Sequence, residues 1–430
     1  MLAFFKVVAV LVLMAVLVAR RVEMGAVLLI AAGAMLVLFW TPPYVLFDQM
    51  TAPGAKFFPG TGRLMVLIIF INTFGHLLSL KPDDDGSGGE TRSGTRQLID
   101  AVATLLRDPR AVVAATPSLI GLLPMPGGAL LSAPMVEEIS AGVVITPEKK
   151  TAVNFWYRHI YEYLFPIYPG IWVMAEVLSV SAATVIGFNW PLTFLMVLAG
   201  LTIFIGIGRK PGYVAPPLTF RTLGRSVADV LRNLWPVLTI VVLFVLVWAA
   251  GYKATWVVTA GLPVVVIAFG LIKGRSLRKI PAFIRTGAQP RFLTLVIAAM
   301  IFKEVVDATG AVGDISRFLR ATSIPPVALC VMLPYLAGFL TGITVAFLGI
   351  SLPLLMDFVM PGGELDAGLA MVVFAGGFMG VMTSPAHLCL VLSRDFYGAD
   401  LAKTYRYLVA PAALVIAGAL ALHLSGVWGS

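Results

Sequence analysis

Three ionisable side chains, those of Arg158, His159 and Glu162, lie within five residues of an otherwise apolar stretch. Charged groups inside a membrane are costly, and they usually face a cavity or one another. On a continuous helix Arg158 and Glu162 are four residues apart and could pair directly, as could His159 and Glu162 at a spacing of three. The set is therefore either an interfacial ion pair or a functional site. In the functional interpretation Arg158 binds the carboxylate or phosphate of a substrate, and His159 or Glu162 couples an ion.

A second polar group, Thr383, Ser384 and His387, surrounds Pro385 in another apolar stretch that is rich in glycine. Pro385 removes a backbone hydrogen bond, so a helix through this segment should break and expose carbonyls and helix ends. We predict Ser384 and Pro385 as substrate contacts. Thr383 and His387 are candidates for ion coupling, because histidine titrates near physiological pH. The alternative is a proline kink beside a packed histidine.

Two turn sequences, Pro124–Gly128 and Leu340–Thr344, interrupt further apolar stretches about half a chain apart. The arm before the first turn, residues 111–123, has 13 residues, whereas a membrane-spanning helix needs roughly 20. Both turns therefore predict re-entrant hairpins, whose helix N-termini suit an anion. Glycine could instead serve only close helix packing. The predicted substrate contacts at the turns are Pro126, Gly127, Gly128, Thr341, Gly342 and Thr344.

The composition of the chain predicts an all-α polytopic membrane protein. Of its 430 residues, 59% are hydrophobic and 12% are charged, and the mean hydropathy is +0.94. Soluble domains carry roughly 25% charged residues. The net charge of +9 fits basic loops on the cytoplasmic side of a membrane better than a nucleic-acid partner. The first segment, residues 2–19, has no cleavage site after it and is predicted to be a retained helix.

The apolar segments predict about ten transmembrane helices, with two re-entrant hairpins at 111–146 and 325–356. Two of the ten, 151–180 and 366–393, are the predicted broken helices. In the orientation that best separates Lys and Arg, 23 face the cytoplasm and five the outside, so both termini are external and the protein is multi-pass in the plasma (inner) membrane. The predicted segments are 2–19, 24–40, 64–80, 151–180, 190–207, 233–250, 255–272, 293–307, 366–393 and 407–425.

This arrangement indicates an inverted repeat, because the two hairpins enter from opposite sides of the membrane. Residues 1–207 form the first half, 208–232 a basic cytoplasmic connector, and 233–430 the second half. Pro109 and Pro325, which open the hairpins, are 216 residues apart, as are Met125 and Thr341 at the turns. The alternative is that any polytopic chain of this length can be cut into similar halves.

The two hairpins of opposite entry with these turns, each followed by a broken helix, resemble the ion-transporter superfamily of secondary carriers, which includes divalent-anion/sodium symporters and citrate and gluconate carriers. The stretch from Pro117 to Val136, together with Arg158–Glu162 and Ser384–His387, looks like an integral membrane branch of unknown function. The resemblance implies a homodimer in which hairpins and broken helices move as an elevator past a fixed scaffold. Sodium-coupled dicarboxylate members carry Ser-Asn-Thr at both turns, whereas this chain has Pro-Gly-Gly and Thr-Gly-Ile-Thr.

We therefore predict a secondary active transporter for a small organic anion, coupled to protons or sodium, with no cofactor, no metal site and no enzymatic activity. Its expected partners are the lipid bilayer, the anionic solute and a second copy of the chain, and not nucleic acid. One rival function is an intramembrane enzyme that acts on a lipid-linked substrate, with His159 and Glu162 as acid/base or metal-binding groups. Another is a passive channel. The sequence has no Walker A motif that would support ATP-driven pumping.

Overall fold

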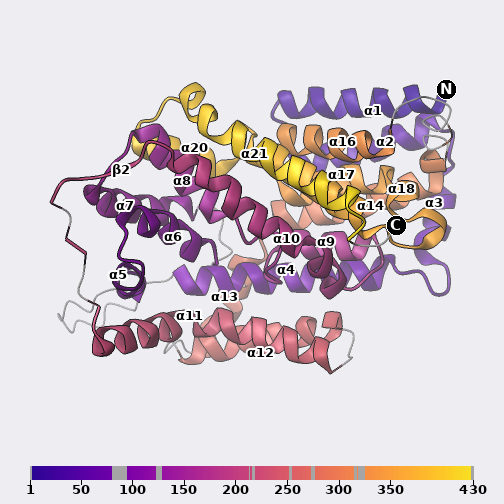
Figure 1. Ribbon diagram of the computed structural model, residues 1–430. Coiled ribbons are helices and arrows are strands. Elements are labelled where there is room, and N and C mark those ends of the chain that lie inside the picture. Colours follow the sequence, from indigo (N-terminus) through magenta and orange to yellow (C-terminus); the bar gives the residue numbers. More distant parts are fainter. Residues whose placement is uncertain are drawn as a thin grey trace.

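The computed structural model describes residues 2–79, 94–122, 128–212, 214–215, 218–250, 254–272, 277–313, 317 and 325–427. These residues are mostly helical, as the composition predicted (Figure 1). Two short strands, β1 (Val143–Val144) and β2 (Gly208–Arg209), pair antiparallel and join the loop after the first hairpin to the connector between the halves.

The helices of the first half differ in length, from 9 residues in α3 and α9 to 23 in α4. They are α1 (Leu2–Ala19), α2 (Met24–Leu38), α3 (Pro43–Thr51), α4 (Phe57–Ser79), α5 (Gly94–Leu106), α6 (Pro109–Gly121), α7 (Ala129–Ile139), α8 (Pro147–Arg158), α9 (Pro169–Val177) and α10 (Ala182–Gly200). Those of the second half are α11 (Phe220–Ala249), α12 (Ala254–Ile272), α13 (Ile280–Gly287), α14 (Pro290–Thr309), α16 (Pro326–Thr341), α17 (Thr344–Leu354), α18 (Met356–Val359), α19 (Ala367–Met382), α20 (Leu388–Tyr397) and α21 (Leu401–Leu424).

The chain is a multi-pass helical membrane protein. Among the described residues, three helices are long and apolar enough to cross a membrane, namely Phe57–Leu77, Ala182–Phe204 and Leu401–Leu424. The number rises to five if two bent helix pairs each count as one span. One of these pairs is α2 with α3, and the chain bends by 118° between them. The expected segment, 24–40, corresponds to α2 alone. The predicted ten crossings exceed this count, because several apolar helices are shorter than a bilayer requires.

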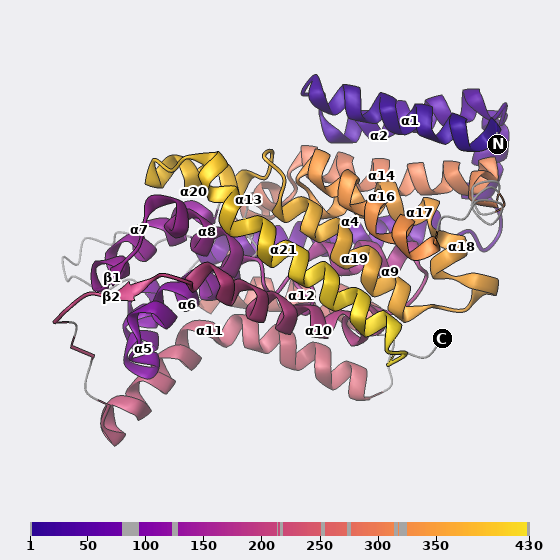
Figure 2. The ribbon, with the colours of Figure 1, turned by 45° about the horizontal axis from the view of Figure 1, so that its top comes forward.

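Each segment predicted as a hairpin contains two short helices that pack on each other, α6 with α7 and α16 with α17; that these pairs are re-entrant stays a prediction. The first turn includes residues 123–127, which lie outside the described part of the chain. Figures 1 and 2 place α6 and α7 toward one end of the molecule, and α16 and α17 toward the other. The start of α1 and the end of α21 both lie at the α17 end.

Helix starts in this fold follow local sequence signals. Asp108, Thr146 and Asp366 precede α6, α8 and α19, and each side chain accepts a hydrogen bond from a first-turn amide. Such caps satisfy donors that the helix itself leaves unpaired. At the second hairpin, α16 ends at Gly342, whose φ of 65° is in the left-handed region, and its amide donates to the Gly338 carbonyl at 2.8 Å. Glycine adopts this conformation without a Cβ penalty, so the turn can be tight.

The remaining helices form the surroundings of these elements. Helix α14 packs on α2 and α17, α4 packs on α13 and α12, and α21 packs on α19 and α10. Helices α11 and α12 lie together along one side of the molecule (Figure 1). The predicted connector, 208–232, is partly helical, since α11 begins at Phe220. Of two predicted interfacial segments, 98–107 lies in α5, and 315–320 falls almost entirely outside the described residues.

Candidate functional site

The first helix break separates α8 from α9. Helix α8 ends at Arg158, where the His159 amide turns back to the Trp156 carbonyl at 3.1 Å. Pro166 and Pro169 follow, and neither can donate a helical hydrogen bond. Pro169 instead opens α9 at its first position, where no such bond is needed. Residues 159–168 therefore leave the helix and form a sequence of turns.

The second break separates α19 from α20 and is shorter. Helix α19 ends at Met382. In a continuous helix the Val381 carbonyl would accept a hydrogen bond from the amide of residue 385, but Pro385 has no N–H. The Ser384 amide donates to this carbonyl instead, at 3.1 Å. Helix α20 then starts after His387. Pro385 and Ala386 are exposed, while Ser384 is fully buried. The predicted break at Pro385 is thus confirmed, and its backbone lies beside open space.

The two breaks meet through their histidines. The Nε2 atoms of His159 and His387 are 3.3 Å apart, and the rings stand nearly perpendicular with their centroids separated by 4.9 Å. The Phe155 ring contacts both imidazoles edge-on, at centroid distances of 5.1 and 5.0 Å. Residues 228 positions apart in the chain therefore share one contact.

A cavity of about 220 Å³ opens beside this histidine pair. It is bordered by the two breaks, by the second hairpin turn, and by α4 and α14. Its lining residues are Ile71, Asn72, Arg158, His159, Glu162, Tyr168, Pro169, Gly170, Phe292, Gly342, Ile343, Thr344, Val345, His387 and Cys389. Polar groups from four segments thus face one small space.

Three helices begin at this cavity without a side-chain cap. The residues that precede α9, α17 and α20 are Tyr168, Ile343 and His387, and the side chain of none accepts a hydrogen bond from the first turn. Uncapped starts also occur elsewhere, for example at α14 and α16. What distinguishes these three is that they converge. Each contributes amide groups and the positive end of a helix dipole to the same space, and such an arrangement favours an anion.

Arg158 supplies the positive side chain at the site. It is only 4% exposed, and its guanidinium lies against Gly128 at the start of α7, so a methyl group there would overlap it. Its carbonyl lies against Gly121 at the end of α6, where a methyl group would collide with backbone. The first hairpin therefore packs directly on the first break. Glycine is required at Gly121, where the neighbour is backbone, whereas at Gly128 the neighbour is the end of a side chain.

The first break is also fixed by hydrogen bonds. The Nδ1 atom of His159 bonds the Phe155 carbonyl at 2.7 Å. The Tyr168 hydroxyl donates to the Gly121 carbonyl, and the Trp172 indole donates to the Pro166 carbonyl at 2.6 Å. These bonds satisfy carbonyls that the helix ladder leaves open, and they tie the break to the hairpin.

Asn154, one turn before the break, joins three helices. Its amide nitrogen donates to the Ser393 hydroxyl of α20 at 2.8 Å and to the Ala129 carbonyl of α7 at 3.2 Å. Tyr397 of α20 adds a hydrogen bond to the Ala133 carbonyl of α7 at 2.8 Å. The first hairpin and both broken helices therefore form one connected unit.

Several predicted site residues lie together at the cavity. The structure brings Arg158, His159, Glu162 and His387 to it, together with Gly342 and Thr344 of the second turn. Gly128 contacts Arg158 at its edge. Pro126 and Gly127 lie outside the described residues.

Other predicted residues point elsewhere. The Thr341 hydroxyl donates to the Ala337 carbonyl of its own helix at 2.7 Å. The Thr383 hydroxyl donates to the Met379 carbonyl at 2.8 Å and contacts the Tyr335 hydroxyl at 3.0 Å. Both Thr383 and Tyr335 line a different groove, between α16 and α21. Ser384 accepts from the Ala386 amide at 3.2 Å and shapes the break, while Pro385 is not among the residues lining the cavity.

The alternative in which Arg158 or His159 pairs directly with Glu162 required one continuous helix, and the helix is not continuous here. Helix α8 ends at Arg158, so Glu162 belongs to the turns of the break, where its amide bonds the His159 carbonyl at 3.4 Å. That alternative fails because it applies a 3.6-residue period across a segment that the later prolines prevent from being helical. The three side chains nevertheless line the same cavity.

Cys389 and the start of α9 are parts of the site that were missed. Cys389 was interpreted as a packing residue; it is buried but also lines the cavity two residues after His387. The spacing His387-x-Cys389 was a signal that could have been read. Pro169–Gly170 likewise marked a helix start, although nothing local indicated that it would face His387.

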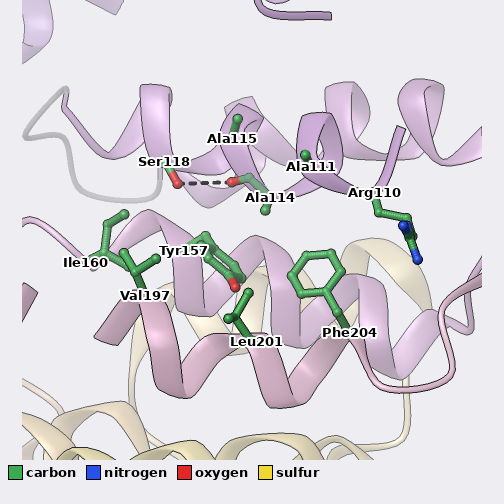
Figure 3. A pocket seen from close by; sticks show the side chains of 10 residues that line it. All are labelled: Arg110, Ala111, Ala114, Ala115, Ser118, Tyr157, Ile160, Val197, Leu201 and Phe204. Carbon is green, nitrogen blue, oxygen red and sulfur yellow. Dashed lines mark hydrogen bonds between the residues drawn. The ribbon is translucent and has the colours of Figure 1, made fainter. Parts of the chain in front are cut away.

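A larger, apolar cavity of about 410 Å³ lies away from the histidines, between α6 and the end of α10 with its 3-10 extension Leu201–Phe204 (Figure 3). Tyr157, Leu201 and Phe204 line it on one side. On the other side the Ser118 hydroxyl is turned to the Ala114 carbonyl of its own helix, at 3.0 Å. This cavity has little that could select a polar solute, and it separates the first hairpin from α10.

Charged residues outside the apolar segments hold the base of the first hairpin. Asp108 accepts from Arg110 at 2.9 Å and from Arg209 at 2.7 Å. Hydrogen bonds from these guanidinium groups, first Arg110 and then Arg209, hold the pKa of the Asp108 carboxyl well below its usual range. Asp108 therefore fastens the start of α6 to β2 as well as capping the helix.

The fold and the cavity define a multi-pass helical membrane protein with a buried polar site between two helix breaks. Residues 104–425 match a family model described as a protein of unknown function, DUF401, and the chain belongs to this family. No curated protein matches the chain. The matched region contains both hairpins and both breaks, and therefore every residue of the site except those of α4.

Proposed function

We propose that the chain is a secondary active transporter for a small organic anion, coupled to protons, with the solute held in the cavity beside His159 and His387. The observation that carries this proposal is the convergence of three uncapped helix starts and the Arg158 side chain on one cavity. A guanidinium binds carboxylate or phosphate through two parallel hydrogen bonds. Helix starts add amides and positive potential without a full charge.

The size of the cavity favours a small solute. Its volume of about 220 Å³ is below the range of about 300–1,000 Å³ that is usual for drug-sized ligands. The solute should also carry apolar surface, because Ile71, Phe292 and Ile343 line the same space. A short-chain carboxylate or a similar organic anion meets both conditions.

Alternating access is supported by the positions of the two hairpins. The order of hairpin, broken helix and long helix occurs twice, as α6 to α10 and as α16 to α21. The hairpins lie toward opposite ends of the molecule (Figures 1 and 2). We propose that they are re-entrant from opposite sides and form an inverted repeat, the arrangement that many carriers use to expose one site in turn to each side.

Apolar gaps beside both hairpins are consistent with sliding. One separates α6 from α10 (Figure 3), and another of about 380 Å³ separates α16 from α1. Surfaces without specific polar contacts can shift past one another without breaking hydrogen bonds. We therefore propose an elevator in which hairpins and broken helices move together, as the connections through Asn154 and Tyr397 suggest. A homodimer, with both termini external in the plasma membrane, remains a prediction.

Proton coupling is proposed from the histidine pair. His159 donates through Nδ1 to the Phe155 carbonyl, which leaves its Nε2 to accept a hydrogen bond from His387. A second proton would place two imidazolium charges 3.3 Å apart unless an anion entered beside them. Proton and anion should therefore bind together.

Uptake into proteoliposomes tests this function. The purified full-length chain would be reconstituted and supplied with a panel of labelled small carboxylates and organic phosphates, under an imposed pH gradient or an imposed sodium gradient. We expect uptake of at least one anion above that of protein-free liposomes, driven by acid outside and collapsed by a protonophore. His76→Gln, in α4 and not among the residues lining the cavity, is the matched control and should behave as wild type.

Absence of gradient-driven uptake for every anion in the panel would contradict the transporter. Uptake that follows only the sodium gradient would still support a transporter, but it would contradict proton coupling through the two histidines. Equilibration without accumulation would indicate a channel.

A further inference from the structure

We infer that His159, His387 and Cys389 form a binding site for a soft divalent metal ion, for which Zn²⁺ is the best fit. Their ligand atoms all lie within 4.8 Å of one another. Imidazole nitrogen and thiolate sulfur are the donors that zinc prefers. The inference is tested without transport, because it depends only on these three side chains and the cavity they share; a bound ion would compete with the coupling proton for the same two Nε2 atoms.

The separation of the two imidazoles matches that of metal ligands. Zinc binds histidine at about 2.0–2.1 Å in tetrahedral geometry, so two coordinating nitrogens lie about 3.4 Å apart. The Nε2 atoms of His159 and His387 are 3.3 Å apart. The two Nε2 atoms therefore stand at the required spacing, and a metal ion would replace the proton of the hydrogen bond between them, with the Cys389 sulfur moving closer.

The surroundings orient the histidines as ligands. Metal-bound histidines usually donate their other ring nitrogen to a carbonyl or carboxylate, which fixes the tautomer. His159 does this through Nδ1 to the Phe155 carbonyl at 2.7 Å. His387 Nδ1 is buried without a hydrogen-bond partner among the described residues, so it can carry the proton when Nε2 coordinates.

The charges around the site decide how a cation could be held there. Coordination converts the Cys389 thiol to a thiolate, and its proton is released to solvent. The thiolate is the negative charge that offsets the ion, whereas Arg158 on the same cavity opposes it. Three protein ligands leave a fourth position, as in catalytic zinc sites, and here it would face the cavity bordered by Gly342 and Thr344. Water or an anionic solute could occupy it.

A bound ion would join the end of α8 to the start of α20. His159 belongs to the first break, His387 to the second, and Cys389 to the first turn of α20, so the metal would fasten the two breaks to each other. Such a link should stabilise the fold by mass action, and the gain should rise with the logarithm of the free metal concentration once this exceeds the dissociation constant.

Cobalt titration of the purified full-length protein tests the site, because Co²⁺ is a spectroscopic substitute for zinc. We expect tetrahedral d–d bands and a sulfur-to-metal charge-transfer band that saturate stoichiometrically with the chain and disappear when Zn²⁺ is added. Cys389→Ser should abolish the charge-transfer band. Mutating a residue that only contacts a metal ligand typically weakens metal binding about 10- to 100-fold. His387→Gln removes a ligand itself, so it should weaken Co²⁺ binding by more than this.

Cys330→Ser and His76→Gln are the matched controls, since neither residue lines the cavity. Both variants should give wild-type spectra, and thermal unfolding confirms that each variant is folded. A wild-type protein without the bands would overturn the inference, as would bands that survive in Cys389→Ser or vanish in Cys330→Ser. Because the spectra require no transport, this result is separate from the outcome of the uptake experiment.

Discussion

The two helix breaks meet at one cavity but differ in how they are held. The first, residues 159–168, is held by Phe155, Tyr168 and Trp172 through hydrogen bonds, and the first hairpin seats on it through Gly121. The second, residues 383–387, exposes Pro385 and Ala386 and is bordered by a single left-handed glycine, Gly342. The first break is therefore the firmly held wall of the cavity, which we call the support, and the second is the less constrained wall, which we call the opening.

This difference assigns separate tasks to the two breaks. A site that binds and releases a solute needs one fixed wall that positions charge and one wall that can open. Arg158 stands on the fixed side, and His387 stands on the side with exposed backbone. Variants at matched positions in the two breaks should therefore divide into those that lower stability and those that change transport.

The largest expected effect is on stability at the first break. In Gly121→Ala the new methyl group would collide with the Arg158 backbone carbonyl, and neither backbone segment can move easily. We expect a loss of at least about 3 kcal/mol, measured by denaturant or thermal unfolding in detergent. Gly342→Ala, in the turn beside the second break, should cost less: about 1–2 kcal/mol for the left-handed backbone, with a smaller added cost from contacts of 3.0–3.1 Å to His387, Ala386 and Ser384.

Gly187→Ala is the control for both glycine variants, because no atom lies within 4 Å of the position of its methyl group. It should be neutral or slightly stabilising in the middle of α10. Equal stability of Gly121→Ala and Gly187→Ala would mean that the first hairpin is not seated on the break.

The two histidines provide the next comparison. His159→Gln should lower stability by about 1–3 kcal/mol, because the buried Phe155 carbonyl loses its hydrogen-bond donor. His387→Gln should cost less than about 1 kcal/mol, since the Nδ1 atom of His387 has no partner among the described residues. Thermal unfolding of both variants measures this, and a greater loss in His387→Gln would reverse the assignment of support and opening.

A smaller effect, on affinity, is expected at Gly128. In Gly128→Ala the methyl group would displace the mobile end of the Arg158 side chain and not the backbone. We expect the fold to persist and the KM for the transported anion to rise roughly tenfold, which corresponds to one charge-assisted hydrogen bond. Uptake kinetics would separate KM from kcat. An unchanged KM would remove Arg158 from the solute site.

The smallest effect is expected outside the cavity, at Asp108. Its pKa is lowered in the folded protein by Arg110 and Arg209, so its contribution to stability is present above the unfolded value of about 3.9 and is lost as the pH falls through the folded value. Asp108→Asn should cost about 0.5 kcal/mol at neutral pH and progressively less below pH of about 4. Asp395→Asn, which removes an exposed pair with the neighbouring Arg394, should show no comparable pH dependence.

The helix breaks and turns were the part of the fold that could be predicted, because particular prolines and glycines end helices there. Pro385 marked the second break, Gly342 the second turn, and the short arm before residue 123 the first hairpin. The site was harder to predict. Thr383 sits at a predicted break but turns toward Tyr335, because the end of α19 fixes which way each side chain points.

The convergence of α9, α17 and α20 depends on long-range packing, which local sequence does not encode. Cys389 was overlooked for the same reason, since an apolar neighbourhood indicates burial but not what else faces the buried space. Arg158 was identified correctly as a cavity residue, whereas the helical spacing that would pair it with Glu162 does not hold, because α8 ends four residues before Glu162.

Protection of Cys389 from labelling tests most directly whether the solute binds where the two breaks meet. In a Cys330→Ser background, Cys389 is the only thiol and lines the cavity. We predict that a transported anion slows modification of Cys389 by a small thiol reagent, at concentrations near its KM, and leaves the labelling of Cys330 in a Cys389→Ser background unchanged. If a transported anion at saturating concentration leaves the rate at Cys389 unaltered, the solute does not bind between the breaks.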